Sequence, residues 1–472
     1  MPVRDSSLVD DVVAAPAGPS IAELATSYRR GDARVTDVVA DVLACIAEWR
    51  DEGIWSGVAD RFELLARARE LESDPEAAGL PLYGIPFGVK DSIDVAGWPT
   101  TLACPGYAYV AERTAPVVQR LLDAGAIMIG KNNLDQFATG LNGTRTPHPI
   151  PRSVFGQDLI CGGSSSGSAR AVALGEVPFA VATDTAGSGR VPPALNGVVG
   201  FKPSRGLIST VGLVPACRSL DCISLIARTP AEAAYLLDIV AFPDDRDPWS
   251  RTRGHASTDL EAVRVGLPDF AELEFFGDHA MAAAHGEARS RVEQTFSVVT
   301  PPLSPFLQAG ELLYSGPWVA ERLAEFGDFL ADHPGEVLPV IAAIIGGGAR
   351  FDAVDVFRAQ YRLAELKAEV GRLFTSMDVL VLPTIGTTFT VPEVLADPIA
   401  TNTKLGHYTH FGNLLDLCAI AVPAGCTDDR RPASLMVIGP ALSDDTVLTV
   451  AAQIVRDQVS LSPPHQPPFR AN

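Results

Sequence analysis

Short apolar runs that alternate with helical stretches fill the sequence from Pro81 onward. The runs IPFGVK (85–90), FAVATDT (179–185) and MDVLVLPT (377–384) contain residues that suit β-strands. The stretch APVVQRLLDAG (115–125), between the first two runs, has helical spacing. Because strands that alternate with helices build a sheet covered by helices, the chain is predicted to be an α/β protein.

The segments outside this alternation are also distinctive. Residues 20–80 are predicted to be mainly helical, because SIAE at 20–23 forms a capping-box pattern and apolar residues then recur at helical spacing. Further strands are expected in VRVGLPDF and LCAIAVPAG, and a helix in SDDTVLTVAAQIVRD. The loop-like segment 241–259 is interpreted as an excursion, and the Pro-rich tail 461–472 is predicted to be disordered.

Charge and cysteine content limit the partners and the compartment. The 37 Lys+Arg against 57 Asp+Glu give a formal charge of -20, which would repel nucleic-acid phosphates and anionic membranes. The longest apolar run, 337–345, is too short to span a bilayer, and the N-terminus lacks a signal-peptide core. Seven cysteines without a C-x-x-C pair argue against a disulfide framework, so a cytoplasmic protein is expected.

Two generic motifs do not support a function. GAIMIGKN (125–132) has P-loop spacing, but Asn132 stands where Ser or Thr should bind magnesium, and AIMI resembles a strand. His407 and His410 lie close in sequence, yet no third ligand accompanies them, so ordinary packing is the better interpretation. No metal and no cofactor are expected.

A third motif gives an alternative mechanism. GSSSG (163–167) matches the G-x-S-x-G nucleophile elbow with Ser165 at its centre, between a candidate strand, DLIC, and a candidate helix, SARAVALG. Such a hydrolase would also need an acid and a histidine later in the chain, and only scattered histidines are present.

The heptapeptide DTAGSGR (184–190) places Ser188 among small residues. A serine nucleophile needs a base, and its tetrahedral intermediate needs preorganised N–H donors. Ala186 and Gly187 would let backbone amides around Ser188 point toward one place. A glycine-rich turn after a strand is the competing interpretation of this segment alone. Lys90 ends an apolar run upstream, and a lysine in a dry pocket can serve as the base for a serine.

Three segments together resemble the amidase signature family: GVKD, GGSSSGSA and DTAGSGRVPPALNGVVGFKPSRG, in the family's order and spacing. The resemblance implies one domain over residues 1–460, with a helical part at 20–80 and a catalytic core at 81–215. The implied fold is one large mixed β-sheet between layers of α-helices. A homodimer is also expected from the family.

The resemblance implies a role for each matching residue. Ser188 would be the nucleophile, Ser164 the bridging cis-serine and Lys90 the base. The oxyanion hole would use backbone N–H groups of four consecutive residues, Thr185, Ala186, Gly187 and Ser188. Arg190 is expected to pair with an acid such as Asp184 and to brace the loop, although a role in substrate binding is the other interpretation.

Within this family, DTAGSGRVP and YSGPWVAER (314–322) resemble the allophanate hydrolase subfamily, which implies that Tyr314 and Arg322 bind substrate. An arginine can grip a carboxylate through two parallel hydrogen bonds. The competing interpretation pairs Arg322 with Glu321 or Glu325 on a solvated helix. In the pocket region, His410 stands where the subfamily pattern suggests asparagine.

The expected activity is hydrolysis of the terminal amide of allophanate to ammonia and N-carboxycarbamate, which yields CO2 and further ammonia. Several subfamily members carry a second domain that processes this product, and its absence from this sequence predicts unaided decarboxylation or another protein. The alternatives are a different amidase of the family, an amidotransferase-like subunit that needs a partner, and a non-catalytic relative. The intact set of Lys90, Ser164 and Ser188 disfavours the last alternative.

Overall fold

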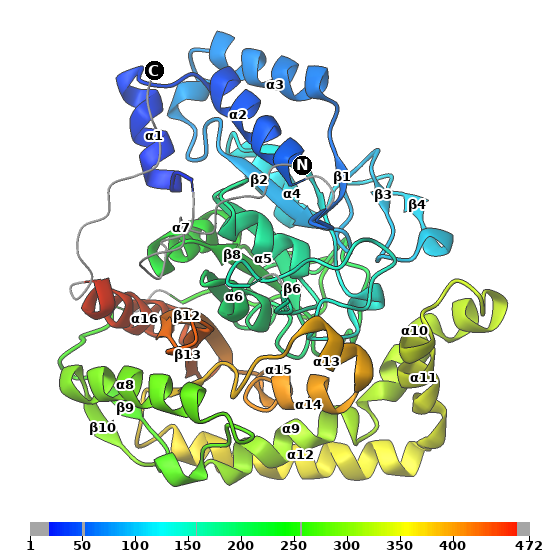
Figure 1. The fold of residues 1–472 in the computed structure, drawn as a ribbon, viewed down its shortest axis with the longest axis vertical. Coiled ribbons are helices and arrows are strands. Elements are labelled where there is room, and N and C mark those ends of the chain that lie inside the picture. The colour runs from blue at the N-terminus through cyan, green and yellow to red at the C-terminus, as the bar shows by residue number, and fades with distance from the viewer. Residues whose placement is uncertain (1–17, 50–51, 157, 255–256, 460–472) are drawn as a thin grey trace.

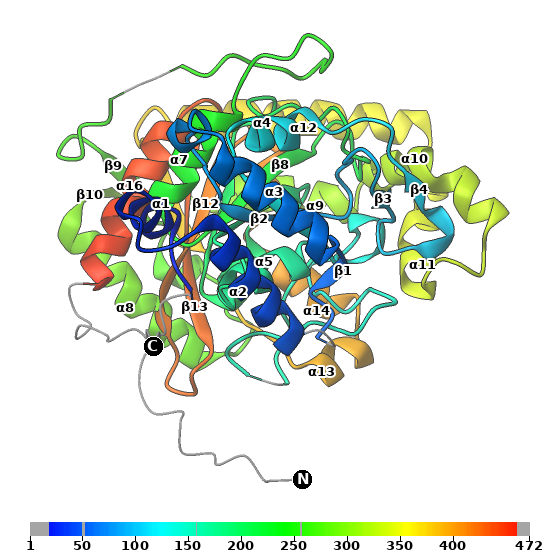
Figure 2. The same ribbon diagram turned by 90° about the horizontal axis from the view of Figure 1, so that it is seen from above.

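A large mixed β-sheet forms the centre of the molecule (Figures 1 and 2). The computed structural model describes residues 18–49, 52–156, 158–254 and 257–459. Within these residues, 11 strands join in the order β1-β5-β2-β6-β8-β7-β12-β13-β11-β9-β10, and β3 and β4 form a separate pair. The strands are β1 (Trp55–Val58), β2 (Pro86–Lys90), β3 (Pro99–Thr100), β4 (Tyr109–Val110), β5 (Ile127–Asn132), β6 (Phe179–Asp184), β7 (Val199–Lys202), β8 (Cys222–Ala227), β9 (Arg264–Gly266), β10 (Ser297–Val299), β11 (Val379–Pro383), β12 (Cys418–Cys426) and β13 (Pro432–Gly439).

Helices surround the sheet. They are α1 (Ile21–Arg30), α2 (Val35–Glu48), α3 (Arg61–Ser73), α4 (Pro116–Asp123), α5 (Ser166–Ala173), α6 (Val191–Asn196), α7 (Pro230–Val240), α8 (His279–Thr295), α9 (Ser304–Tyr314), α10 (Trp318–Asp332), α11 (Pro339–Gly346), α12 (Ala353–Leu373), α13 (Val391–Ala396), α14 (Ala400–Leu405), α15 (Phe411–Leu414) and α16 (Asp444–Val459).

The period-two alternation of strand side chains explains why helices cover both faces. In β6, Phe179 and Val181 pack into one apolar cluster with α4, α7 and α16, whereas Ala180 and Ala182 pack into another with α2, α3 and α5. Farther along the sheet, Leu380 of β11 belongs to a third cluster with α9, α12 and α15. The predicted sheet between helical layers is therefore confirmed.

The sheet is mixed because its strands meet in both directions. β2 runs parallel to β5 and β6, and β9 runs parallel to β10 and β11. The pairs β6–β8, β7–β8, β7–β12, β12–β13, β11–β13 and β1–β5 are antiparallel. The parallel strands β2 and β6 end side by side, at Lys90 and Asp184, and this edge carries the candidate site.

Several local expectations can be compared with these elements. The capping box of Ser20 and Glu23 starts α1, as predicted. The N-terminal part contains one strand, β1, which the expectation of a mainly helical region missed; its residues pair with β5 across a register shift. The segment DLIC (158–161) forms only isolated bridges through Leu159 and Ile160, so the strand predicted there is wrong.

The described residues of the excursion 241–259 contain no helix or strand. Arg253 ties the segment back to the domain through ion pairs with Asp238 of α7 and Asp445 of α16. The predicted tail at 461–472 lies outside the described residues.

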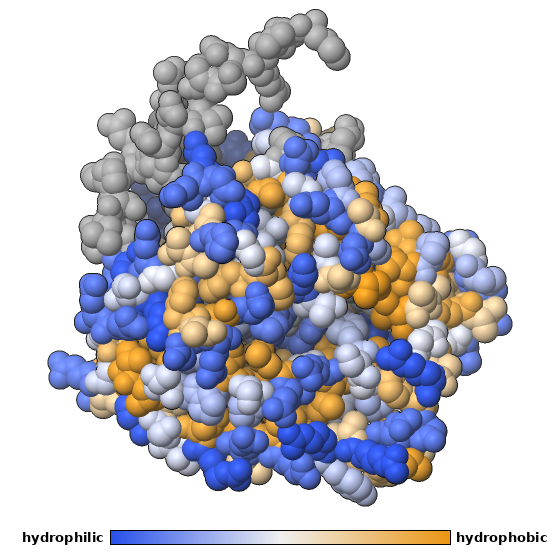
Figure 3. All heavy atoms as spheres, turned by 60° about the horizontal axis from the view of Figure 1, so that its bottom comes forward, coloured by the Kyte–Doolittle hydropathy of each residue, from blue (hydrophilic) through white to orange (hydrophobic). Residues whose placement is uncertain are grey.

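The surface mixes hydrophilic and hydrophobic residues over the face in Figure 3. Across the described part of the chain, every helix is too short or too polar to cross a bilayer.

Candidate active site

Lys90 and Ser164, predicted as base and bridging serine, are in direct contact. Lys90 is the last residue of β2 and is fully buried, and its Nζ donates to Ser164 Oγ at 2.7 Å. The Gly163–Ser164 peptide bond is cis, as the family resemblance implies. A second hydroxyl, Thr183 Oγ1, accepts from Lys90 Nζ at 2.7 Å. The lysine is thus held between two hydroxyl groups.

Burial lowers the proton affinity of the Lys90 side chain. Loss of hydration lowers the pKa of Lys90 to about 7, although the negative charges of Asp135, Asp184 and Asp221 oppose the shift. The nearby positive charge of Arg322 lowers the pKa further. A substantial share of Lys90 is therefore neutral near pH 7 and able to accept a proton.

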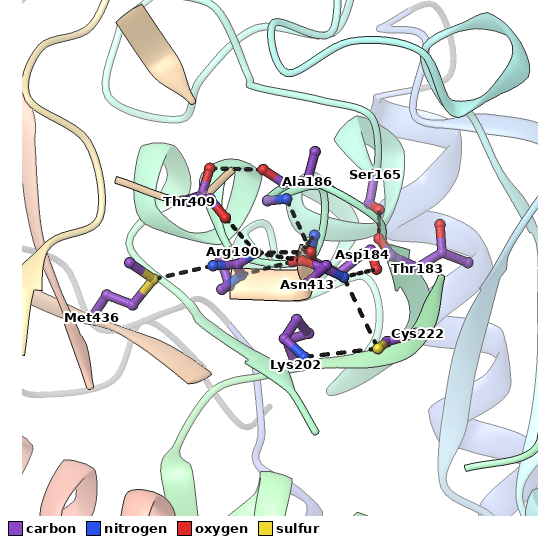
Figure 4. A network of polar contacts seen from close by, with 12 residues as sticks. Ser165, Thr183, Asp184, Ala186, Arg190, Lys202, Cys222, Thr409, Asn413 and Met436 are labelled. Atoms are coloured by element: carbon purple, nitrogen blue, oxygen red, sulfur yellow. Dashed lines mark hydrogen bonds and ion pairs between the residues drawn. The ribbon is translucent and has the colours of Figure 1, made fainter. Parts of the chain in front are cut away.

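The loop that carries Ser188 is braced by an acid and an arginine (Figure 4). Asp184, at the end of β6, accepts from the backbone N–H groups of Gly187 at 2.9 Å and Gly189 at 3.0 Å. Arg190 donates to the same carboxylate through Nε at 2.8 Å and Nη2 at 2.9 Å. The predicted bracing role of Arg190 is confirmed, and this buried guanidinium is occupied by protein groups.

The brace extends into the C-terminal part of the chain. Arg190 Nη2 also donates to the carbonyl of Thr409 and to Asn413 Oδ1, and Asn413 Nδ2 donates to the Asp184 carbonyl at 2.8 Å. Burial alone would raise the pKa of Asp184, but the charge and hydrogen bonds of Arg190 outweigh it and the pKa is lowered. Asp184 therefore remains a carboxylate that holds the loop.

The four amides predicted as an oxyanion hole differ in their bonding. The Gly187 N–H is already bound to Asp184, whereas the hydrogen bonds of the described residues include none from the N–H groups of Thr185, Ala186 or Ser188. Gly187 has a φ of +128°, and a Cβ there would lie 2.3 Å from Thr409 Oγ1. Only glycine fits this position without strain.

Ser188 lies on this loop with 2% of its surface exposed. Among the described residues, Ser164 is hydrogen-bonded to Lys90, whereas the Ser188 hydroxyl takes part in no such bond. Ser188 follows the end of β6, whereas Ser164 lies in the loop before α5 and reaches the end of β2 through Lys90. All three predicted residues are therefore buried, and Lys90 and Ser164 are in direct contact.

The structure does not support Ser165 as the serine of a nucleophile elbow. No strand of the described residues leads directly into Ser165, although α5 does begin at Ser166. The Ser165 hydroxyl donates to the Thr183 carbonyl at 3.2 Å and is buried. This serine braces β6, where Thr183 also contacts Lys90. Sequence reasoning missed Thr183, because its only signal was a polar residue at the end of a predicted strand.

Arg322 and Tyr314 flank the start of α10. Tyr314 ends α9, Pro317 caps α10, and Arg322 lies in the second turn of α10 with 2% of its surface exposed. Arg322 Nη1 donates to Thr139 Oγ1 at 2.8 Å. The Tyr314 ring lies 5.1 Å from the His410 ring, between centroids.

The acids expected to compete for Arg322 are bound elsewhere. Glu321 accepts from the Ser219 N–H and hydroxyl, and Glu325 accepts from Arg218. Within the described part of the chain, no acidic side chain forms an ion pair with Arg322. The solvated-helix interpretation of Arg322 is therefore wrong.

A third acid, Asp221, contributes negative charge to the surroundings of Arg322, but its carboxylate is hydrogen-bonded to other residues. It accepts from Thr185 Oγ1 at 2.5 Å and from the N–H groups of Ala216 and Cys217. Burial raises the pKa of Asp221 to about 6. Arg322 is thus a buried cation whose direct side-chain partner is a neutral hydroxyl.

A cavity of about 210 Å³ opens on the Tyr314 side of the site, and its lining includes Arg145, Tyr314, Arg350 and Asn402. Lys90 and Ser188 do not line it. Asn402 accepts from the Leu141 N–H and so fastens the loop 140–149.

The remaining motifs have structural roles. Lys131 of the P-loop-like segment lies in buried strand β5 and pairs with Asp91 at 3.3 Å. His410 is buried against Tyr314, and loss of hydration lowers its pKa to about 3, so this ring is neutral near pH 7. The described residues contain no group of three or more His, Cys, Asp or Glu side chains that could hold a metal ion.

Comparisons with known proteins agree with this architecture. The amidase family matches residues 51–448. The chain is 40% identical to urea amidolyase of Saccharomyces cerevisiae over 408 residues. This aligned region covers 85% of this chain and 22% of that protein. It is 30% identical to a glutamyl-tRNA(Gln) amidotransferase subunit of an Exiguobacterium species, covering 91% of this chain and 95% of that protein.

Among solved structures, Kluyveromyces lactis allophanate hydrolase superposes with a TM-score of 0.87 at 36% identity, over 93% of this chain and 72% of that one. The mixed sheet and the cis-serine beside a buried lysine define an α/β protein with a hydrolase type of site. The chain belongs to the amidase family. It spans about a fifth of the length of the urea amidolyases that it matches, at 22%.

Proposed function

We propose that this protein hydrolyses the terminal amide of allophanate, which is urea bearing a carboxylate. The observation that carries the proposal is Arg322: a buried guanidinium without an acidic partner in the described residues, close enough to Lys90 to lower its pKa. A buried charge is costly unless it is paired. A substrate carboxylate would supply the missing partner and could accept two parallel hydrogen bonds.

The proposed chemistry begins at Ser188. Its Oγ attacks the terminal amide carbonyl while its proton passes through Ser164 to neutral Lys90. The oxyanion that forms is stabilised by the unoccupied amides of Thr185, Ala186 and Ser188 rather than by Gly187. Lys90 returns the proton through Ser164 to the leaving nitrogen, and ammonia departs.

Water then completes the reaction. It attacks the acyl-enzyme carbonyl, its proton is taken up by the same relay, and Ser188 is released with N-carboxycarbamate as the product. This product loses CO2 to give carbamate, which decomposes to CO2 and a second ammonia. No metal or cofactor is required by these steps.

The comparisons support this proposal by similarity. The structure of K. lactis allophanate hydrolase matches 93% of the chain, and the S. cerevisiae urea amidolyase is 40% identical over the matched region. The amidotransferase-like alternative is supported by the Exiguobacterium protein, which is 30% identical. The higher identity to the urea amidolyase favours allophanate.

The test compares allophanate with biuret, a neutral molecule in which an amide replaces the carboxylate. Arg322→Gln should lower kcat/KM for allophanate at least about 100-fold, because it removes a charged hydrogen-bonding group worth about 3 kcal/mol. Any turnover of biuret should change little. Arg218→Gln is the control, since Arg218 pairs with Glu325 at the surface.

Equal losses on both substrates would make Arg322 structural and remove the basis of the proposal. Inactivity of the purified protein on every small amide, with turnover only after a partner protein is added, would favour the amidotransferase-like alternative.

A cytoplasmic homodimer also belongs to the proposal. All seven cysteines are free, which supports a reducing compartment. The dimer rests on family resemblance, and sedimentation equilibrium tests it directly.

A further inference from the structure

Arg145 is a second buried arginine near Arg322, and its guanidinium binds only neutral groups. Nη1 donates to the Thr139 carbonyl at 2.9 Å, and Nη2 donates to the Pro398 carbonyl at 2.6 Å. The buried Nε has no hydrogen-bond partner among the described residues. Asp135 lies close, but its carboxylate accepts from the Arg145 backbone N–H rather than from the guanidinium. The charge of Arg145 is therefore left without a bonded counter-ion.

Thr139 brings the two arginines together. Its carbonyl accepts from Arg145, and its hydroxyl accepts from Arg322. Two guanidinium groups that share one small residue repel each other and have both lost hydration. Burial lowers the pKa of Arg145, and the positive charge of Arg322 adds to that shift. A bound anion would relieve this repulsion.

The space beside Arg145 can admit a small anion. The cavity of about 210 Å³ is lined by Arg145 and Tyr314 but not by Arg322, which reaches Arg145 only through Thr139. Its charged lining residues, Arg145 and Arg350, are both cationic. Arg350 is exposed, with its guanidinium 4.6 Å above the Phe351 ring. Arg145 is the buried cation of this lining.

Hydrogen bonds connect Arg145 to the catalytic loop. The Arg145 backbone N–H donates to Asp135 Oδ1 at 2.9 Å, and the Asp135 N–H donates to the Ser164 carbonyl at 3.1 Å. At Gly163, the residue before Ser164, a Cβ would lie 1.9 Å from Asp135 Oδ2, so the two loops touch. The arginine is therefore anchored to the same segment that holds the bridging serine.

We infer that Arg145 is a second specificity-determining residue, which binds the substrate carboxylate together with Arg322 across Thr139. The inference rests on the proposed function and adds to it a substrate class: short linear amides with a carboxylate next to the amide-bearing unit. Both guanidinium groups interact with the same carboxylate. A neutral amide of the same size binds more weakly, because it carries no negative charge to balance the two buried positive charges.

The test measures binding rather than turnover, in protein carrying Ser188→Ala. Malonamate has the length and carboxylate of allophanate, and malonamide is its neutral counterpart. By titration calorimetry, Arg145→Gln should weaken malonamate binding at least tenfold and change malonamide binding less than twofold. Arg218→Gln, which removes a surface charge paired with Glu325 outside the cavity lining, is the control and should change both affinities less than twofold.

Arg145 also fastens two carbonyl groups, so a structural effect must be separated from a binding effect. Circular dichroism and thermal unfolding check the fold of each variant. If Arg145→Gln does not fold, Arg145→Lys keeps the charge but loses the planar fork, and it should weaken malonamate at least threefold while sparing malonamide.

Three results would contradict the inference. Equal weakening of both ligands, or no weakening of malonamate, would overturn the inference. Absence of malonamate binding before Arg145 is changed would also overturn it. Ammonia release from allophanate is measured separately with Ser188 intact, so an active enzyme whose malonamate affinity ignores Arg145 would refute the inference and leave the proposed function standing.

Discussion

Lys90 Nζ and Ser164 Oγ, which are 74 positions apart in the chain, lie 2.7 Å from each other in a buried site. The pairing joins the end of β2 to the loop before α5. A lysine that is buried against hydroxyl groups has lost its water without gaining a bonded carboxylate, and this is why its neutral form is accessible.

The first prediction concerns pH. The folded pKa of Lys90, about 7, lies below its ordinary value, and the neutral form is the one that accepts the proton of Ser188. Below about pH 7 the base is protonated, so kcat/KM should fall about tenfold for each unit of pH on the acid side and level off above about pH 8. A profile that stays flat down to about pH 5 would exclude Lys90 as the base.

The second prediction concerns the stability of the Ser188 loop. Arg190→Gln leaves the buried carboxylate of Asp184 without its charged partner, so the free energy of unfolding should fall by about 3 to 5 kcal/mol. Urea unfolding measures this loss. The control is Arg34→Gln, which breaks the exposed Arg34–Glu72 pair and should leave the midpoint almost unchanged. Similar losses in both variants would contradict the bracing role.

The third prediction concerns the backbone of the oxyanion hole. Gly187→Ala adds a Cβ at a φ of +128°, 2.3 Å from Thr409 Oγ1, so the loop must shift. Displacing one or more amide donors should lower kcat about 100-fold. Gly346→Ala is the matched control, because its φ is -60° and no atom lies within 4 Å of the added Cβ. Full activity in Gly187→Ala would show that these amides are not donors to the oxyanion.

Local sequence patterns predicted those parts of the fold that depend on short-range order. The capping box at Ser20 and the buried strands that end at Lys90 and Asp184 follow from neighbouring residues. The Arg190–Asp184 pair was also predictable, because the two residues lie six positions apart at the two ends of one loop. The strand β1 was missed, since four residues between helices carry little periodic signal.

The site features that escaped prediction depend on long-range contacts. Thr183 contacts Lys90, which is 93 positions away in the sequence. Arg145 and Arg322 come near each other because both donate hydrogen bonds to Thr139. The bond from the Gly187 amide to Asp184 likewise requires the actual turn geometry. Composition and spacing do not encode such encounters. Family resemblance indicated Lys90, Ser164, Ser188, Tyr314 and Arg322, but not Thr183 or Arg145.

The most direct test of the central claim is ammonia release from allophanate by the purified protein, beside biuret, malonamate and a plain aliphatic amide, with Ser188→Ala as control. We predict release of two ammonia molecules per allophanate and little from the neutral amides. In Ser188→Ala, turnover should fall below about a thousandth of the wild-type value, because the covalent pathway is lost. Release mainly from a neutral amide, or undiminished release by Ser188→Ala, would contradict the proposed function.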